Sequence, residues 1–247
     1  MPVFFIHSQD VVDGVITITD PLLTHISKSL RTKSGDPLVF NDNQGHRYQA
    51  IVDQITKKTL QARILQIETL PLSTRPSLIL VQALLKGEKM GWVIQKATEL
   101  GVSTIIPLIT DRVILKLTGK QEETHQARWQ RISLEAAQQS ERRTLPNILP
   151  VQTFQQFLAT AQEHHVILMA EREEAAGLLT IPCSMETRKL GVTVMIGPEG
   201  GWSAEELQAA QSHHWVFASF GKEILRAETA SLAALAILQA RFNVENA

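Results

Sequence analysis

The chain has 247 residues, of which 44% are hydrophobic, and its 24 Lys and Arg against 25 Asp and Glu give a net charge of -1. This apolar content can bury one large or two modest cores, while its apolar runs fall well short of the roughly 20 residues that span a bilayer. The first residues lack the basic and apolar regions of a signal peptide, so a cytoplasmic protein with no membrane partner is expected. The lone Cys183 can form no internal disulfide and has no ligand-spaced neighbours, so neither a thiol mechanism nor a metal site is expected.

Charge is unevenly distributed along the chain. Residues 1–72 carry 7 basic and 7 acidic side chains, residues 73–143 carry 11 and 7, and residues 144–247 carry 6 and 11. The middle third is therefore electropositive by four charges. Attraction to phosphate depends on local patches, so the near-neutral total does not exclude an RNA partner.

The first 70 residues are predicted to be mainly β. Strand-like runs cover 37–41, 46–55 and 59–68, and polar turn residues separate them. A helix is predicted to begin at Pro21 with Asp20 as its cap. The pattern indicates a small barrel with an inserted helix. Basic residues near the end of that helix, Lys28, Arg31 and Lys33, suit a solvated face or an RNA contact equally well.

The segment 71–76 has the composition of a linker, and strands then alternate with helices. Strands are predicted at 77–85, 102–109 and 166–170, and helices at 88–100, 124–143 and 153–164. This alternation predicts a mostly parallel sheet covered on both faces. Trp92 and Trp129 are interpreted as packing residues, and the pairs His164–His165 and His213–His214 as exposed helix ends.

The stretch around residues 197–201 is the strongest candidate for a ligand site. A buried strand is predicted at 192–196, and Ser203 with Glu206 forms a capping box that begins a helix. The turn between them has no cation and contains Glu199, so it suits a neutral or cationic ligand better than a phosphate. A tight structural turn with no ligand is the alternative.

A second short strand near the end of the chain precedes another glycine turn. The strand is predicted at 215–220, Gly221 ends it, and residues 222–226 lead into a helix over 227–240. That helix is rich in Ala and Leu around its whole circumference. Burial on several sides, and hence a homodimer, is expected.

Together, Gly197-Pro-Glu-Gly-Gly201 and Gly221-Lys-Glu-Ile-Leu-Arg-Ala-Glu-Thr-Ala230 resemble the signature of the RsmE family. These SPOUT-superfamily enzymes methylate a uridine in small-subunit (16S) ribosomal RNA. The resemblance implies a PUA-like, RNA-binding β-barrel over 1–72 and an α/β SPOUT domain with a parallel sheet and a trefoil knot over 73–247. It also implies S-adenosylmethionine (SAM) as cofactor and N3 of the uracil as methyl acceptor.

The resemblance assigns roles to individual residues. Arg226 would stabilise the anion that develops on the uracil carbonyls. Glu199 would take the proton or, alternatively, accept backbone hydrogen bonds within the knot. Residues implied to hold the cofactor are Ile196, Gly197, Pro198, Gly200, Gly201, Phe220, Gly221, Ile224, Leu225 and Arg226, and those implied to contact RNA are Arg31, Lys86, Lys89, Arg112 and Arg142.

Two other function classes remain open alongside a methyltransferase for this or another RNA. A non-catalytic RNA-binding protein of the same fold would have no physical reason to keep the glycines of both turns. An α/β enzyme acting on a small nucleotide would need neither the separate barrel nor the electropositive middle third.

Overall fold

The computed structural model describes residues 3–69, 76–115, 117–161, 165–170, 175–181 and 191–244. It divides into two compact units: unit 1 holds residues 1–72 and 137–145, and unit 2 holds residues 73–136 and 146–247. Cys183 and residues 71–75 of the predicted linker lie outside the described residues.

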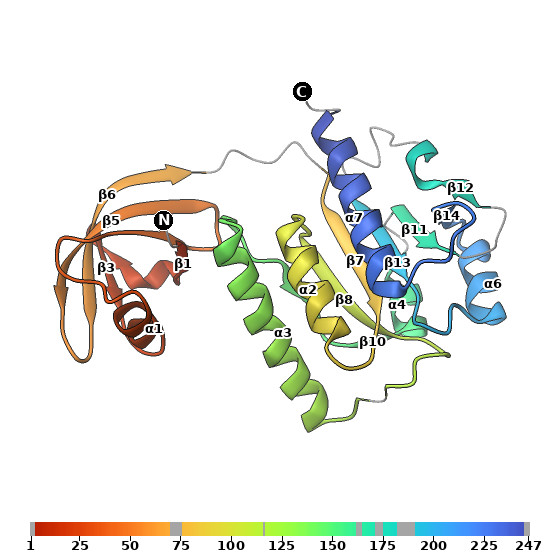
Figure 1. The fold of residues 1–247 in the computed structure, drawn as a ribbon, viewed down its shortest axis with the longest axis horizontal. Helices are drawn as coiled ribbons and strands as arrows, with labels where there is room; N and C mark the ends of the chain where they lie inside the picture. The colour runs from red at the N-terminus through yellow and green to blue at the C-terminus, as the bar shows by residue number, and fades with distance from the viewer. Residues whose placement is uncertain are drawn as a thin grey trace. The chain divides into compact units, whose positions relative to one another are not determined.

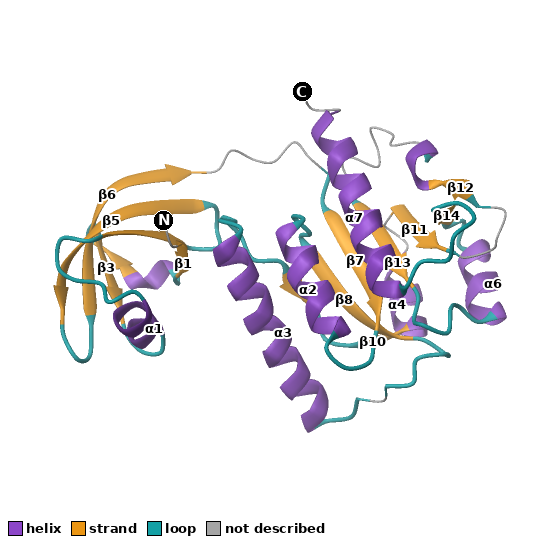
Figure 2. Ribbon diagram, in the orientation of Figure 1, coloured by secondary structure: helices purple, strands orange, loops and turns teal. Residues whose placement is uncertain are grey.

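Unit 1 is a six-stranded sheet with helix α1 (Leu22–Ser29) beside it (Figure 2). The strand order is β1-β4-β5-β6-β3-β2, and all neighbours are antiparallel except β1 and β4. The buried side chains of its core include Ile16, Ile26, Phe40 and Leu60. The strands are β1 (Val3–Phe5), β2 (Val11–Val12), β3 (Val15–Ile18), β4 (Pro37–Asn41), β5 (His46–Ile55) and β6 (Leu60–Thr69).

The long strands of unit 1 confirm the prediction, whereas the helix begins one residue late. Pro21 precedes the first helical residue rather than occupying it. Asp20 still contributes, because its Oδ1 accepts the backbone N–H of Thr24 at 3.0 Å. Sequence periodicity missed β1 to β3 because these strands are only two to four residues long.

The segment 137–145 belongs to unit 1, although the sequence placed it in a second domain that ran unbroken from residue 73. Side chains of the β4–β5 hairpin bind its backbone. Asn41 Nδ2 donates to the carbonyl of Arg142 at 2.7 Å, and Arg47 Nη2 donates to the carbonyl of Glu141 at 2.8 Å. These side-chain partners satisfy carbonyls that have left the helix, so the segment packs with the hairpin.

Unit 2 is built on a parallel sheet of order β10-β8-β7-β13-β11-β14-β12, with β9 paired to β8. All its pairs are parallel, which confirms the predicted sheet. The strands are β7 (Leu78–Ala83), β8 (Thr104–Ile109), β9 (Asn147–Ile148), β10 (Gln152–Thr153), β11 (His165–Met169), β12 (Ala176–Gly177), β13 (Val192–Ile196) and β14 (Val216–Ser219). The helices are α2 (Lys89–Glu99), α3 (Lys120–Gln139), α4 (Phe154–Thr160), α6 (Ala204–Ser212) and α7 (Ala227–Val244).

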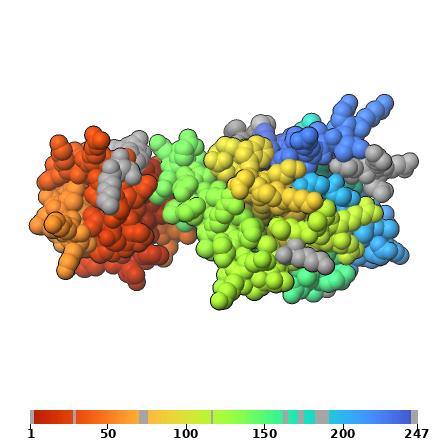
Figure 3. Space-filling model, turned by 60° about the horizontal axis from the view of Figure 1, so that its bottom comes forward, coloured from red at the N-terminus to blue at the C-terminus, as the bar shows by residue number. Residues whose placement is uncertain are grey.

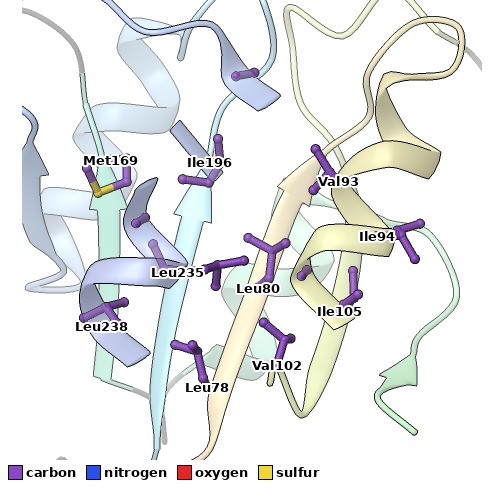
Figure 4. Close-up of a cluster of buried hydrophobic side chains, with 14 of the residues drawn as sticks. Leu78, Leu80, Val93, Ile94, Val102, Ile105, Met169, Ile196, Leu235 and Leu238 are labelled. Atoms are coloured by element: carbon purple, nitrogen blue, oxygen red, sulfur yellow. The ribbon is translucent and has the colours of Figure 1, made fainter. Parts of the chain in front are cut away.

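Helices cover both faces of this sheet. α2 and α7 pack against each other, and α7 lies across β7 and β13 on one face (Figure 1). Figure 4 shows Leu235 and Leu238 of α7 and Val93 of α2 around Leu80 of β7. On the other face the aromatic side chains of α4 pack with Trp202 and Trp215. Alternate residues of the central strands therefore enter two separate cores.

Three predictions about unit 2 were wrong in detail. The helix expected at 124–143 covers Lys120–Gln139, and it ends earlier because the chain turns after Gln139, where Glu141 adopts a left-handed φ of 53°. Trp92 is 43% exposed, since it lies off the buried stripe of α2. His165 is the first residue of β11 and half-buried, not an exposed helix end.

The last helix is less enclosed than its composition indicated. Ala234, Leu235 and Leu238 are buried against the sheet, whereas Ala236 and Ala240 are exposed. Among the described residues, no helix combines the length and apolarity needed to cross a bilayer. Nor do these residues contain a cluster of three or more His, Cys, Asp or Glu that could hold a metal ion.

Candidate active site

A cavity of about 870 Å³ lies at the carboxyl ends of β11, β13 and β14. Its walls come from the ends of these strands, the turn after β13, the loop after β14 and the first residues of α7. This edge of a parallel sheet is where ligands of open α/β folds bind. All ten residues predicted to hold a cofactor line the cavity: Ile196, Gly197, Pro198, Gly200, Gly201, Phe220, Gly221, Ile224, Leu225 and Arg226.

The turn after β13 is held close to a buried tryptophan. A Cβ on Gly197 would lie 3.1 Å from the ring of Trp202, closer than an ordinary contact. Trp202 is fixed in turn, because its Nε1 donates to the carbonyl of Met169 at 2.9 Å. Gly201 closes the turn with a φ of 70° and donates its N–H to the carbonyl of Pro198 at 2.9 Å. Residue 197 is therefore glycine because the Trp202 ring leaves little room for a side chain, and residue 201 is glycine because its φ is positive.

The loop after β14 leaves its peptide groups available. Within the described part of the chain, residues 220–225 form no backbone–backbone hydrogen bond. Residues 221–224 are exposed, so the N–H and C=O groups of this stretch are accessible to a bound molecule. Ile196 and Phe220 add apolar wall, and a Cβ on Gly221 would meet no atom within 4 Å. These features fit an adenosine and amino-acid moiety held by main-chain groups.

Glu199, in the middle of the turn, accepts several hydrogen bonds. Its Oε1 lies 3.2 Å from Lys89 Nζ, and the backbone N–H groups of Lys86 and of Glu199 itself also bond to the carboxylate. Partial burial would raise the pKa of Glu199, but these donors outweigh it and hold the pKa below its usual value. A carboxylate that is so stabilised in its ionised form is a weak proton acceptor. Of the two roles predicted for Glu199, the geometry favours accepting hydrogen bonds within the turn over taking a proton from the substrate.

Lys89 connects the turn after β13 to the start of α7. Its ammonium lies 3.2 Å from Glu199 of the first loop and 3.5 Å from Glu228 in the first turn of α7. In Figure 3 the yellow surface that follows β7 adjoins the blue surface of these C-terminal segments. A single cation therefore balances two carboxylates, one in the turn after β13 and one in the first turn of α7.

A second network holds the turn from the side of β8. Arg112 Nη1 donates to the carbonyl of Gly200 at 3.0 Å. Glu206, buried in the capping box of α6, accepts the N–H of Asp111 at 3.0 Å and the N–H of Ser203 at 2.9 Å. Burial raises the pKa of Glu206 above its usual value, and the nearby Asp111 carboxylate adds to the rise. The capping box predicted from sequence is confirmed, and it also binds the segment after β8.

Comparison of the whole chain with known proteins identifies its family. A family model described as an RNA methyltransferase domain matches residues 71–239, and one described as an RNA methyltransferase PUA domain matches residues 18–65. "Ribosomal RNA small subunit methyltransferase E" of Synechocystis is 32% identical over 94% of this chain and 75% of that protein. The chain belongs to the ribosomal RNA small subunit methyltransferase E family. The Bacillus subtilis member is 29% identical over 90% of this chain and 88% of its own.

A solved member of the family has the same fold. The crystal structure of the Neisseria gonorrhoeae enzyme, which is bound to S-adenosylmethionine, superposes with a TM-score of 0.85. It is 30% identical, and the alignment covers 98% of each chain.

Of the remaining predicted residues, Arg226 lies at the cavity and is exposed. Lys89 and Arg112 also line the cavity, where both bind protein atoms, while Lys86 and Arg31 are exposed. Arg142 lies in unit 1 and is half-buried, and burial lowers the pKa of its guanidinium to about 10. Of the five basic residues predicted to contact RNA, Arg31 and Arg142 thus belong to unit 1, and Lys86, Lys89 and Arg112 belong to unit 2.

Sequence reasoning missed several residues of the cavity wall. Met169 and Ala170 line it from the end of β11, and Trp202 lines it directly after the double glycine. The position of Met169 at the carboxyl end of a predicted parallel strand was a usable signal, because such ends share one edge of the sheet. The strand order that places β11 between β13 and β14 carries no signal in the sequence.

Proposed function

We propose that this protein is a SAM-dependent methyltransferase that methylates N3 of a uridine in small-subunit (16S) ribosomal RNA. The observation that carries the proposal is a cavity whose walls contain both glycine loops of the family, at the carboxyl edge of a parallel sheet. The Neisseria relative, with SAM bound and the same fold, supports the choice of cofactor.

The ten loop residues named above would hold the cofactor. Peptide groups of residues 220–225 would bind its polar atoms, and Ile196 and Phe220 would pack against its apolar surface. When bound, SAM supplies the methyl group. The turn after β13 has no Lys or Arg of its own, and the two cations that reach it bind its carboxylate and a carbonyl, which suits a ligand with a positive sulfonium centre better than a phosphate.

Arg226 is the catalytic residue of this proposal. The imide nitrogen of uracil is a poor nucleophile while protonated, and negative charge spreads to its two flanking carbonyl oxygens as the proton leaves. A guanidinium at the cavity can stabilise that charge. Glu199 then holds the turn, consistent with its lowered pKa and its three donors.

The proposal also includes a PUA-like barrel in unit 1 and a trefoil knot in unit 2. Unit 1 forms a PUA-like barrel that contacts RNA through the exposed Arg31, and Lys86 contacts RNA from unit 2. The chain forms a trefoil knot around the cavity. This is supported by β11 lying between β13 and β14, and by α7 returning from β14 to pack on β13 and β7.

A homodimer working in the cytoplasm completes the proposal. Ala236 and Ala240 leave one side of α7 exposed and apolar, which a second subunit would cover. Analytical ultracentrifugation tests the homodimer independently of the activity. A monomeric mass at micromolar concentration would contradict the dimer.

The test is methyl transfer from labelled SAM to small ribosomal subunits, or to their naked RNA, from a strain that lacks the protein. We expect N3-methyluridine that appears only with enzyme and only with SAM. A methylated nucleoside of another kind would move the activity to another base. SAM binding without any transfer would favour another RNA, and absence of SAM binding would favour a non-catalytic RNA-binding protein.

A further inference from the structure

Three hydrogen bonds connect the segment after β8 to the segment after β13, although about 90 residues separate them in sequence. Arg112 Nη1 donates to the carbonyl of Gly200 at 3.0 Å. Asp111 N–H donates to Glu206 Oε1 at 3.0 Å, and Ser203 Oγ lies 2.6 Å from Asp111 Oδ2. Glu206 is only 3% exposed, so the link at that end is desolvated and well fixed.

The bond from Arg112 acts on one particular peptide group. The Gly200–Gly201 peptide accepts from Arg112 through its carbonyl, and its N–H donates to the carbonyl of Pro198 at 2.9 Å. Both polar ends of this peptide are therefore occupied, and its plane has a single orientation. Arg112 also packs on the turn, because a Cβ on Gly200 would lie 3.2 Å from Arg112 Cβ.

We propose that Arg112 is a positioning residue for the cofactor, which holds the Gly200 peptide in the orientation that binds SAM. This inference rests on the proposed function, and it replaces the RNA-phosphate contact that the sequence assigned to Arg112. Arg112 itself lines the cavity, and loss of its guanidinium removes one of the two hydrogen bonds that fix this peptide, so that only the bond from Gly201 N–H to Pro198 still opposes its rotation. A rotated carbonyl would change the wall of the cavity at Gly200, where the cofactor is proposed to bind.

The two roles of Arg112 predict different measurements. A positioning residue changes SAM affinity in the protein alone, without RNA. A phosphate contact leaves SAM affinity unchanged, lowers RNA affinity, and reduces the slope of log affinity against log salt by about one.

The experiment compares Arg112→Ala, Arg112→Lys and the control Arg131→Ala. Arg131 is an exposed arginine of α3 that pairs only loosely with Glu135, at 3.8 Å. SAM dissociation constants are measured by calorimetry, RNA affinity of the cofactor-free protein over a salt series, and KM and kcat in the transfer assay. We expect Arg112→Ala to weaken SAM binding about 10-fold and to raise KM for SAM more than it lowers kcat.

Arg112→Lys should recover part of the SAM affinity, since an ammonium can still donate one hydrogen bond but lacks the planar fork. Arg131→Ala should match the wild type in every measurement. Wild-type SAM affinity in Arg112→Ala, with a smaller salt slope for RNA, would overturn the inference. A second outcome would also overturn the inference that Arg112 is a positioning residue. In that outcome, Arg112→Ala and Arg112→Lys lose SAM affinity equally, although both unfold like the wild type. Failure of the wild type to bind SAM would instead remove the proposed function, so the two failures are distinguishable.

Discussion

Lys89 Nζ lies 3.2 Å from Glu199 Oε1, and this ion pair connects helix α2 to the turn that follows β13. The same ammonium lies 3.5 Å from Glu228 at the start of α7. The turn after β13 and the start of α7 thus share a cation supplied by α2. The pair is about one-third exposed, so salt in the solvent weakens it.

Lys89→Met should therefore weaken SAM binding in a salt-dependent way. We expect the dissociation constant to rise about threefold at low ionic strength and to approach the wild-type value near 1 M salt. Calorimetry at the two salt concentrations measures this. The matched control is Lys96→Met on the same helix, whose ion pair with Glu99 lies within α2. Equal SAM affinity of Lys89→Met and wild type at low salt would contradict the linking role.

Gly197→Ala should distort the turn. The added methyl would lie 3.1 Å from the Trp202 ring, which its bond to Met169 holds in place, so the ring cannot move aside freely. Overpacking of this kind costs about 1–3 kcal/mol, and SAM affinity should fall with it.

Gly177→Ala is the control for that variant. Its φ is −60°, and the nearest atom to the added methyl would be 3.9 Å away, so the change should be close to neutral. Urea unfolding monitored by tryptophan fluorescence measures the unfolding free energies of Gly197→Ala and Gly177→Ala. The fluorescence reports on unit 2, since all four tryptophans lie there. A Gly197→Ala protein as stable as Gly177→Ala would show that the turn adapts.

Ser231 and Gln82 form a buried polar pair beneath the first turns of α7. Both are fully buried, and the Ser231 hydroxyl lies within hydrogen-bond distance of Gln82 Oε1 and of the Ala227 carbonyl. Ser231→Ala leaves the Gln82 oxygen without that partner and should cost about 1–3 kcal/mol of unfolding free energy. The double variant with Gln82→Met removes the unpaired oxygen but also the bond from Gln82 Nε2 to the carbonyl of Ala83, so its loss should be smaller than the sum of the two single losses. Additive losses in the fluorescence unfolding assay would argue against the pairing.

Tyr48 gives unit 1 its own titration signal, because it is the only tyrosine in the chain. Its hydroxyl donates to Asp42 Oδ2 at 3.0 Å. Burial, followed by the hydrogen bond to Asp42 and the charge of Asp42, raises the pKa of Tyr48 to about 12. A pKa raised above the unfolded value of about 10 contributes stability below pH 10 that is lost as the pH rises toward 12.

Tyrosinate absorbance should thus titrate near pH 12 in the wild type and at a lower pH in Asp42→Asn, in which burial still raises the pKa but the charge of Asp42 is absent. Asp53→Asn serves as the control, since that carboxylate lies on β5 with 46% of its side chain exposed. A wild-type midpoint near 10 in the folded protein would show that Tyr48 is not bonded to the Asp42 carboxylate.

Local chemistry in the sequence was enough to predict the turn after β13. Gly197 to Gly201, the capping box of Ser203 and Glu206, and the apolar strand before them lie within 15 residues, so their geometry depends on neighbours along the chain. The parallel sheet followed in the same way from the alternation of strand and helix periods.

The partners of that turn were beyond prediction because they come from distant parts of the chain. Lys89 and Arg112 reach it from elements 110 and 88 residues away, and nothing in their own surroundings distinguishes them from solvated basic residues. Both were assigned to RNA for that reason. The exposure of Trp92 was predictable, since Met90, Val93, Ile94 and Ala97 already complete the buried stripe of α2 at helical spacing.

The segment 137–145 has a consequence for how the chain is made. Unit 1 is discontinuous, and the β4–β5 hairpin binds backbone groups at Glu141 and Arg142 and, through Asn43, at Leu145. A nascent chain that has emerged only as far as residue 72 still lacks those partners. The N-terminal unit therefore waits for about seventy further residues to leave the ribosome before it can close its own hydrogen bonds. An expression fragment cut at residue 72 would keep that deficiency permanently.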